Sequence, residues 1–376
     1  MIPVFRPSIG DEELAAVKEV FKSYWIGLGP KTEEFERKFA EYSGVNYAIG
    51  TSNGTAALHL ALKSFNLCPG DEVILPSLTF ISCAHAVLYC GAKPVFADVY
   101  ADTLTLNIND IKEKITKKTK AIMPVHYGGH PCDMDAILEI AKEHNLIVIE
   151  DAAHACGAEY KRRKIGSISD ITCFSFHAVK NLTTGEGGMI TTNSANIADM
   201  LRRLRWLGIS KGTWDRYAPR QDASLESLPK WYYEVAELGY KYHMSDIQAA
   251  IGIVQLKKLD KLNQKRREIA KYYSEQLSKL SWIETPVEKE YAKCVYHLYV
   301  IKAENRDGLI PYLAKNGIAA SVHYMPIHLH PLYRKYKTSV PVTMKVWKKL
   351  VTLPMFPDLS NSDTENIIKT IRRFKP

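Results

Sequence analysis

The sequence lacks the features that mark several large classes of protein. Residues 1–13 contain no basic stretch followed by an apolar one, so they do not resemble a signal peptide. No window approaches the roughly 18 uncharged apolar residues that a membrane span needs, and we expect no membrane association. There is no internal repeat, no low-complexity stretch and no basic tail. Because these absences argue against secreted, membrane-spanning and repeat proteins, we expect a globular enzyme or a globular binding protein.

Cysteine is sparse. Seven cysteines are scattered along the chain, and an odd, dispersed set favours reduced thiols and a cytoplasmic protein.

The formal net charge is +9, which suits either phosphate-bearing ligands or nucleic acid. Because the basic residues are spread out and no nucleic-acid motif is present, we expect a solvated basic surface and no nucleic-acid binding.

Short apolar runs alternate with helical patterns through the first two-thirds of the 376 residues. This alternation predicts an α/β fold with a mostly parallel sheet covered on both faces. The length suits two domains, predicted as residues 1–250 and a smaller α+β domain over residues 251–376. The predicted strands are residues 47–50, 73–75, 95–99, 121–125, 146–150, 171–176 and 189–192.

Three other segments have distinct patterns. Ser245 precedes a long helical pattern that runs to about residue 280. Residues 209–236 are polar and aperiodic, which predicts a long, functional surface loop. Near the amino terminus, one helical face is predicted to carry Leu14, Val17, Val20 and Phe21.

Lys180 is a candidate nucleophile. It follows the predicted strand at residues 171–176 and precedes a glycine-rich turn. Ligands of open α/β sheets bind at the carboxyl ends of the strands. Burial there lowers the pKa of an amine and so favours the neutral form that makes an imine. The position alone also fits an ordinary surface lysine.

Two further features suit the same crevice. Asp151 ends the strand at residues 146–150 and can hold a pyridine nitrogen protonated, although it also fits a helix cap or a metal ligand. At Gly54, Thr55 and Ala56 a strand turns into a helix, whose free amides and dipole favour a phosphate. With an aromatic ring at Phe80, these residues supply each anchor that pyridoxal phosphate needs.

Several sequence motifs follow one another in an order that is typical of a known protein family. They include Trp-Ile-Gly-Leu-Gly-Pro at residues 25–30, Glu-Asp-Ala-Ala-His at 150–154, Thr-Thr-Gly-Glu-Gly-Gly at 183–188 and Gly-Tyr-Lys-Tyr at 239–242. In this order the chain resembles the DegT/DnrJ/StrS family of nucleotide-sugar aminotransferases, which depend on pyridoxal phosphate and have fold type I. The resemblance implies a seven-stranded, mostly parallel sheet between helices and a smaller C-terminal α+β domain.

The resemblance also implies roles for single residues. Lys180 corresponds to the lysine that carries the cofactor as a Schiff base and shuttles the proton, and Asp151 to the partner of the pyridine nitrogen. Phe80 takes the place of the aromatic ring that stacks on the cofactor, and His154 that of the residue beside the cofactor ring. The implied phosphate contacts are Thr55, Ala56 and Ser175.

Members of this family are typically homodimers with shared active sites. A partner asparagine usually reaches the cofactor phosphate, but this chain has Lys241 at that place. An ammonium can still donate to phosphate with an added charge, or the side chain can point to solvent. The resemblance implies substrate contacts at Trp25, His323, Tyr324 and His328, although the histidine-rich segment also suits interface packing.

The implied reaction moves the amino group of L-glutamate, which leaves as 2-oxoglutarate, through pyridoxamine phosphate to a keto-sugar. Lysine rather than histidine at position 180 favours transamination over dehydration. The motif at residues 183–188 favours carbon 4 of a nucleotide-linked 4-keto-6-deoxy sugar, as in polysaccharide or O-antigen biosynthesis. A 3-keto nucleotide sugar or a cyclitol ketone is the alternative. Basic residues within 211–220 are candidates for attracting the nucleotide diphosphate.

Two other interpretations stay open. A cofactor-binding regulator without turnover is a different class of protein, but the complete set of Lys180, Asp151 and Thr55 favours an enzyme. His126, His130 and Cys132 invite a zinc interpretation. Their spacing matches no common zinc pattern, and we expect no metal.

Overall fold

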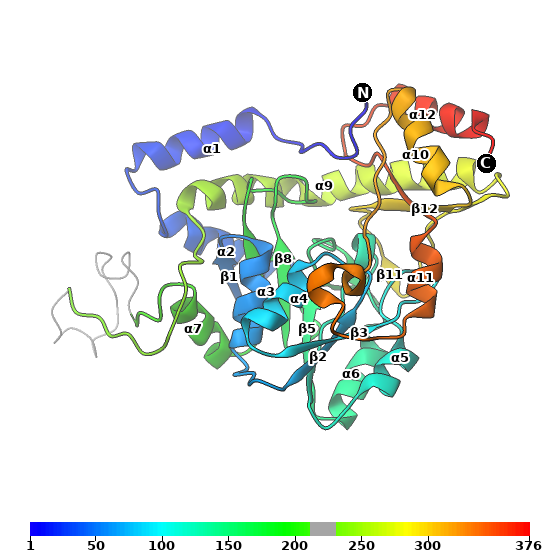
Figure 1. Cartoon of the computed structure of the whole chain (residues 1–376). Coiled ribbons are helices and arrows are strands. Elements are labelled where there is room, and N and C mark those ends of the chain that lie inside the picture. Colours follow the sequence, from blue (N-terminus) through cyan, green and yellow to red (C-terminus); the bar gives the residue numbers. More distant parts are fainter. Residues whose placement is uncertain (211–230) are drawn as a thin grey trace.

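A seven-stranded sheet forms the centre of the molecule (Figure 1). The computed structural model describes residues 1–210 and 231–376. Strand β9 runs antiparallel to both of its neighbours, while the other neighbouring pairs are parallel, so the predicted mostly parallel sheet is confirmed. In sheet order the strands are β1 (Tyr47–Thr51), β9 (Gly188–Thr192), β8 (Ile171–Ser175), β5 (Ile147–Asp151), β4 (Thr119–Ile122), β2 (Glu72–Pro76) and β3 (Lys93–Ala97).

Helices cover both faces of this sheet. Successive side chains of a strand point to opposite faces, and Ile74 accordingly packs in one buried cluster while Val73 and Leu75 pack in the other. The first cluster lies under α2 (Pro30–Ser43), α5 (Ile108–Lys114), α6 (Met134–Glu143) and α9 (Asp246–Leu277). The second lies under α3 (Gly54–Lys63), α4 (Ser82–Tyr89) and α7 (Ala195–Leu204).

Helix α9 links the two halves of the chain. Ser245 precedes the helix, as predicted, and also caps it, because its hydroxyl accepts a hydrogen bond from the amide of Gln248. The amino-terminal helix α1 (Asp11–Lys22) packs along α9. Only part of the predicted apolar face of α1 is covered: Val20 is buried, but Leu14 and Phe21 are 69% and 56% exposed.

The C-terminal part builds its own antiparallel sheet from β10 (Ile283–Glu284), β12 (Tyr299–Ala303) and β13 (Leu350–Leu353). Helices α10 (Arg306–Lys315) and α12 (Asn361–Arg373) cover it, and α11 (Pro341–Trp347) leads into β13. A third, small sheet joins β11 (Ala292–Lys293) to β6 (Glu159–Tyr160) and β7 (Arg163–Lys164). The predicted boundary at residue 250 lies inside α9, and the division into two domains stays a prediction.

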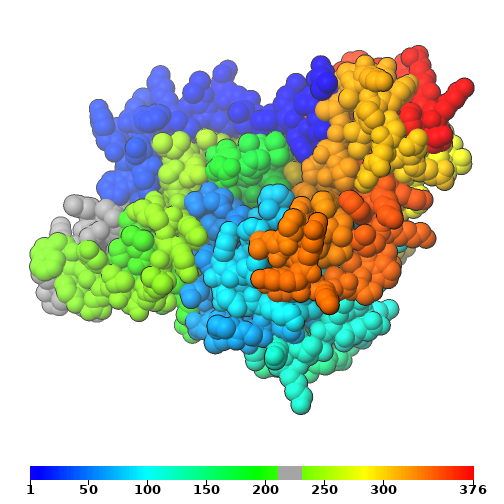
Figure 2. Space-filling model, viewed as in Figure 1, coloured from blue at the N-terminus to red at the C-terminus, as the bar shows by residue number. Residues whose placement is uncertain are grey.

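The C-terminal part rests on the edge of the large sheet. Figure 2 shows the C-terminal segment in orange lying directly against the cyan surface of the first half. Two hydrogen bonds stabilise this contact. The amide of Ile327 donates to the carbonyl of Ser77 at 2.8 Å, and the Thr338 hydroxyl donates to the carbonyl of Phe96 at 2.7 Å. Within the described residues, none of the helices is both long and apolar enough to cross a membrane.

Candidate active site

A cavity of about 910 Å³ opens at the carboxyl ends of the parallel strands. Asp151 is the last residue of β5, and Lys180 follows the neighbouring strand β8 through a short turn. The adjacency of these strands therefore brings the two side chains into one cavity. Of the residues predicted for the site, those that line the cavity are Gly54, Thr55, Ala56, Phe80, Asp151, His154, Ser175, Lys180, His323 and Tyr324.

The amino terminus of α3 forms one wall of the cavity. Asn53 caps this helix by accepting a 2.8 Å hydrogen bond from the amide of Ala56. Gly54 is required by space, because a Cβ atom there would lie 2.8 Å from Ser175 Cβ. The Thr55 and Ser82 hydroxyls lie 2.8 Å apart beside it. Hydroxyl groups around a helix amino terminus are suited to an anion such as phosphate.

Asp151 is held in a fixed orientation at the floor of the cavity. Its side chain is buried. One oxygen, Oδ1, accepts from the amide of Ala153 at 2.9 Å, and the other, Oδ2, accepts from the thiol of Cys83 at 2.9 Å. A carboxylate anchored in this way presents a localised negative charge to the cavity.

Lys180 has a perturbed amine. Burial lowers its pKa to about 8, although the nearby charge of Asp151 acts in the opposite direction. The Nζ atom lies 3.4 Å from Nε2 of His297. A larger share of neutral amine is therefore present near neutral pH than for an ordinary lysine, as nucleophilic chemistry requires.

Aromatic rings form another part of the cavity wall. Phe80 is 53% exposed, and its ring lies 5.8 Å from that of Tyr324. The Tyr324 hydroxyl is 3.0 Å from Nε2 of His154. Burial lowers the pKa of His154 well below its usual range, so this imidazole is neutral. The pKa of His323 is lowered to about 4 by burial and by Lys180, and its Nδ1 lies 2.8 Å from the Thr352 hydroxyl.

Three of the predicted residues do not line this cavity in a single chain. The indole of Trp25 donates to the carbonyl of Leu28 at 2.9 Å, and Nδ1 of His328 lies 2.6 Å from the Ser77 hydroxyl. The Lys241 ammonium lies over the indole of Trp206, 3.3 Å from the ring centroid.

Alternation along the backbone explains the position of Lys241. Its neighbours Tyr240 and Tyr242 line the cavity. Successive side chains of an extended segment point to opposite sides, and the segment is extended where Lys241 bridges to Trp206. Lys241 therefore turns away from the cavity of its own chain.

The residues considered for zinc have other partners. The imidazole of His126 accepts from the amide of Cys132 at 3.0 Å and contacts Glu150 at 2.7 Å, and His130 donates to the carbonyl of Pro131 at 2.7 Å. Across residues 1–210 and 231–376, no three His, Cys, Asp or Glu side chains are grouped so that they could hold a metal ion.

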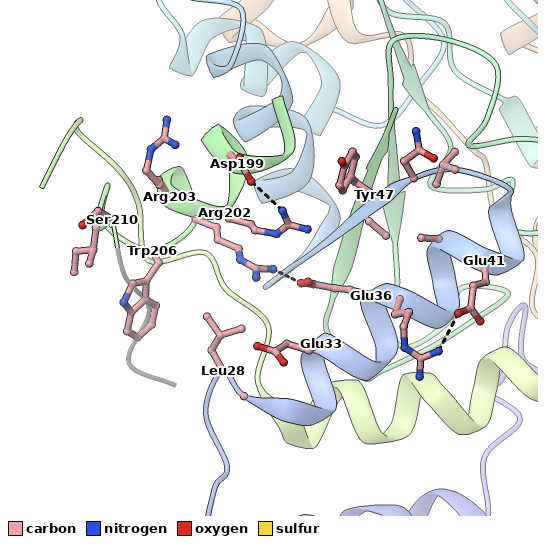
Figure 3. A pocket seen from close by; sticks show the side chains of 18 residues that line it. Leu28, Glu33, Glu36, Glu41, Tyr47, Asp199, Arg202, Arg203, Trp206 and Ser210 are labelled. Atoms are coloured by element: carbon pink, nitrogen blue, oxygen red, sulfur yellow. Dashed lines mark hydrogen bonds and ion pairs between the residues drawn. The ribbon is translucent and has the colours of Figure 1, made fainter. Parts of the chain in front are cut away.

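A second cavity, of about 680 Å³, lies beside α2 and α7 (Figure 3). Its charged side chains largely neutralise one another, which makes it a weaker candidate for chemistry. The pairs are Arg37 with Glu41, Arg202 with Asp199, and Arg205 with Glu36.

Sequence reasoning missed several residues of the first cavity. Phe5 comes from the amino terminus, and His297 comes from the loop before β12. His297 stands alone before an apolar run, where a buried structural histidine is the ordinary interpretation. Other lining residues that were assigned no role include His59, Ser82 and Tyr89, and the two tyrosines of the motif at residues 239–242, Tyr240 and Tyr242.

The structure combines a sheet with one reversed strand, a lysine and a carboxylate at adjacent strand ends, and a helix amino terminus suited to phosphate. Together these features define a class of enzyme. The protein is a pyridoxal-phosphate-dependent aminotransferase of fold type I. Residues 7–372 match the DegT/DnrJ/EryC1/StrS aminotransferase family, and the chain belongs to it.

Related proteins support this assignment. The spore coat polysaccharide biosynthesis protein SpsC of Bacillus subtilis is 43% identical over 99% of this chain and 96% of its own. The crystal structure of the aminotransferase TlmJ of Streptoalloteichus hindustanus is 35% identical with a TM-score of 0.91, covering 99% and 98% of the two chains. Spr1654 of Streptococcus pneumoniae, solved in a PMP form and a PLP form, is 32% identical; its PMP form has a TM-score of 0.91 and covers 98% of both chains.

Proposed function

We propose that this enzyme transfers the amino group of L-glutamate to the 4-keto carbon of a nucleotide-linked 4-keto-6-deoxy sugar. The observation that carries the proposal is the meeting of Lys180, Asp151 and the α3 amino terminus in one cavity. The name of SpsC, a relative in polysaccharide biosynthesis, supports a sugar substrate. The motif at residues 183–188 supports carbon 4. A 3-keto nucleotide sugar or a cyclitol ketone is the second candidate.

The residues around the cavity fit the cofactor. The amino terminus of α3, with the Thr55 and Ser175 hydroxyls, would hold its phosphate. Phe80 and His154 would flank its ring, and Asp151 would face the ring nitrogen. When bound, pyridoxal phosphate supplies an aldehyde that condenses with amines and a protonated ring that withdraws electrons.

Lys180 has two tasks in this scheme. Its Nζ atom would be the amine that holds the aldehyde of the cofactor in the resting enzyme. Once displaced by the amino donor, the same Nζ would take a proton from the α-carbon of the donor and give it back at a different carbon, as a general base and then a general acid. A pKa of about 8 suits both tasks, because neither protonation state is rare near neutral pH.

The other residues orient the reactants and the charge. Asp151 would keep a proton on the ring nitrogen, and its two hydrogen bonds fix the orientation of the carboxylate. His323 and Tyr324 lie on the wall where the keto-sugar would enter. Because the imidazole of His323 is neutral, it would serve as a hydrogen-bonding group for sugar hydroxyls rather than as a charge.

We further propose a cytoplasmic homodimer with shared sites. The apolar side chains Leu14 and Phe21 on α1 are exposed in the single chain, which supports a covered face. Lys241 points away from its own cavity, which supports a contact with the cofactor phosphate of a partner. All seven cysteines are free thiols, as in a reducing compartment. The basic segment at residues 211–220 lies outside the described residues.

Two experiments test the function. Borohydride should fix the cofactor onto Lys180, as read by peptide mass spectrometry, and Lys180→Ala should abolish both the label and turnover while the protein stays folded. A panel of 4-keto-6-deoxy and 3-keto nucleotide sugars, with glutamate as donor and NMR of the products, should give an amine at carbon 4. Label on another lysine would refute the assigned role, and amine only at carbon 3 would favour the second candidate.

A further inference from the structure

His297 lies beside the amine of Lys180 and was not predicted from the sequence. It is 2% exposed, and its Nε2 atom lies 3.4 Å from Lys180 Nζ. Its other ring nitrogen, Nδ1, is buried and has no hydrogen-bond partner. Nearly all buried polar groups of proteins are paired. The unpaired Nδ1 of His297 is therefore unusual, and the only hydrogen-bonding contact of this ring within the described residues is the one at Nε2.

Two rings and the backbone fix the imidazole in place. Phe5 stacks on it with ring centroids 5.5 Å apart and an interplanar angle of 6°, and His154 packs at 4.5 Å. The loop that carries His297 is tied to the loop that carries Lys180, because the side chain of Asn181 donates to the carbonyl of Val295 at 3.0 Å. The distance between Lys180 and His297 is thus set by contacts outside the pair.

We propose that His297 is a positioning residue for Lys180, whose Nε2 accepts a hydrogen bond from the free ammonium and holds Nζ in the cavity. The inference rests on the proposed function, in which Lys180 is released from the cofactor during every turnover. A free lysine side chain has much rotamer freedom. The hydrogen bond confines it to the place from which it moves the proton and later reforms its bond.

The tautomer follows from the charges around the pair. Burial, then Lys180, lowers the pKa of His297 well below its usual range, so the ring is neutral and one nitrogen accepts. The groups that face the pair are the carboxylate of Asp151, the thiol of Cys83, the guanidinium of Arg266 and the neutral rings of His154 and His323. With Nε2 as the acceptor, the proton of the neutral ring sits on the orphaned Nδ1.

Three substitutions separate the hydrogen bond from packing. His297→Phe keeps a ring against Phe5 but removes the acceptor. His297→Gln keeps an acceptor near the place of Nε2, and His297→Asn has one only near Nδ1. We expect His297→Phe and His297→Asn to lower kcat about tenfold with little change in the KM for glutamate, because hydrogen bonds to charged groups have this magnitude. His297→Gln should lose less than about threefold.

The ionisation of Lys180 provides a readout that does not depend on turnover. In the full-length apoenzyme, the pH dependence of Lys180 amidination, followed by mass spectrometry, reports the amine pKa. Loss of an acceptor that favours the ammonium should lower this pKa by about one unit in His297→Phe, and His297→Gln should restore it. Thermal melting of each variant checks that it is folded.

The outcomes distinguish this inference from the proposed function. If the pKa of Lys180 and kcat are the same in His297→Phe as in the wild type, the positioning role is wrong. The same conclusion follows if His297→Gln is as impaired as His297→Phe, because packing then explains the loss. If the wild-type holoenzyme gives no borohydride-fixed label on Lys180, the proposed function itself fails.

Discussion

The thiol of Cys83 donates a hydrogen bond to the carboxylate of Asp151, with Sγ 2.9 Å from Oδ2. Burial raises the pKa of this thiol well above its usual range, and the charge of Asp151 raises it further. Cys83 therefore stays protonated and remains a donor at every physiological pH. Cys83 belongs to α4, so this helix helps to orient the carboxylate of Asp151 in the candidate site.

The weakness of a thiol donor sets the first prediction. Cys83→Ala removes one weak hydrogen bond from Asp151, and we expect kcat to fall by no more than about threefold. Asp151→Asn removes the charge proposed to keep the ring nitrogen protonated, and we expect a fall of about a hundredfold or more. Steady-state rates of the two variants provide the test. Equal losses would mean that the thiol, and not only the carboxylate, controls the cofactor.

Thiol reactivity in the native protein gives a second prediction. Cys68 is exposed, whereas Cys83, Cys132, Cys156, Cys173 and Cys294 are buried and Cys90 is half-buried. Burial also raises the pKa of Cys90 to about 11. Iodoacetamide at pH 8 should therefore label Cys68 in one fast phase, measured by mass spectrometry, and Cys68→Ser should remove that phase. A second thiol of equal speed would contradict the buried placement.

The amine of Lys180 should reduce the stability of the apoenzyme. Its pKa is about 8 in the folded chain and 10.5 ordinarily. Between pH 8 and pH 10.5 the unfolded chain binds more protons at this lysine than the folded chain does, so the free energy of unfolding rises with pH. Below pH 8 the full cost of burying the ammonium applies. We expect Lys180→Met to stabilise the apoenzyme at pH 7 by up to about 3 kcal/mol.

The pH dependence of that gain is the critical measurement. Urea unfolding at several pH values should give a gain that is constant below pH 8 and disappears towards pH 10.5. The matched control is Lys279→Met, at an exposed position on the surface, which should give no such trend. A gain that does not vary with pH would point to packing rather than to the charge.

The central sheet could be predicted from the sequence because its strands are continuous apolar runs. Ile149 and Ile171, for example, are fully buried on neighbouring strands. The positions of Asp151 and Lys180 at strand ends follow from the same runs. Such a pattern fixes where a strand ends, and the ends of adjacent parallel strands necessarily meet.

Other parts of the site depend on tertiary contacts that carry no local pattern. His297 approaches Lys180 only because its loop is fastened to Gly128 and Asn181. Helix α1 was correctly predicted, but its apolar face is only partly covered within the single chain. The apolar period of a helix reports that a face is to be buried, and it does not report against which surface.

The ion pair of Glu36 and Arg205 gives a fourth prediction. Both side chains are buried, and Arg205 also donates to the carbonyl of Gly50 at 2.7 Å. Both residues line the second cavity, where Figure 3 labels Glu36 on α2. Removing one partner leaves a buried charge uncompensated, so Glu36→Ala should cost about 3–5 kcal/mol in the free energy of unfolding.

Two comparisons isolate the buried charge as the cause. Replacing both Glu36 and Arg205 by leucine should cost less than Glu36→Ala, because no charge is then left alone. Glu41 pairs with Arg37 on the exposed side of the same helix, and Glu41→Ala should cost no more than about 1 kcal/mol. Urea denaturation measures all three. A double variant as unstable as the single one would attribute the loss to packing.

Mixing two inactive variants tests whether the sites are shared. If Lys241 of one chain contacts the cofactor phosphate held by its partner, Lys180→Ala and Lys241→Ala are each strongly impaired. A heterodimer of the two contains one complete site, because one chain supplies Lys180 and the other supplies Lys241. Random reassociation of equal amounts should then restore about a quarter of the wild-type rate.

The matched control pairs Lys180→Ala with Asp151→Asn. Both residues line the cavity of one chain, so neither site of this heterodimer is complete, and mixing should restore nothing. If the first mixture also stays inactive, or if Lys241→Ala alone keeps full activity, Lys241 has no role across the interface. Its ammonium would then serve only the contact with Trp206, 3.3 Å from the ring centroid, where a cation gains up to about 2 kcal/mol from the indole face.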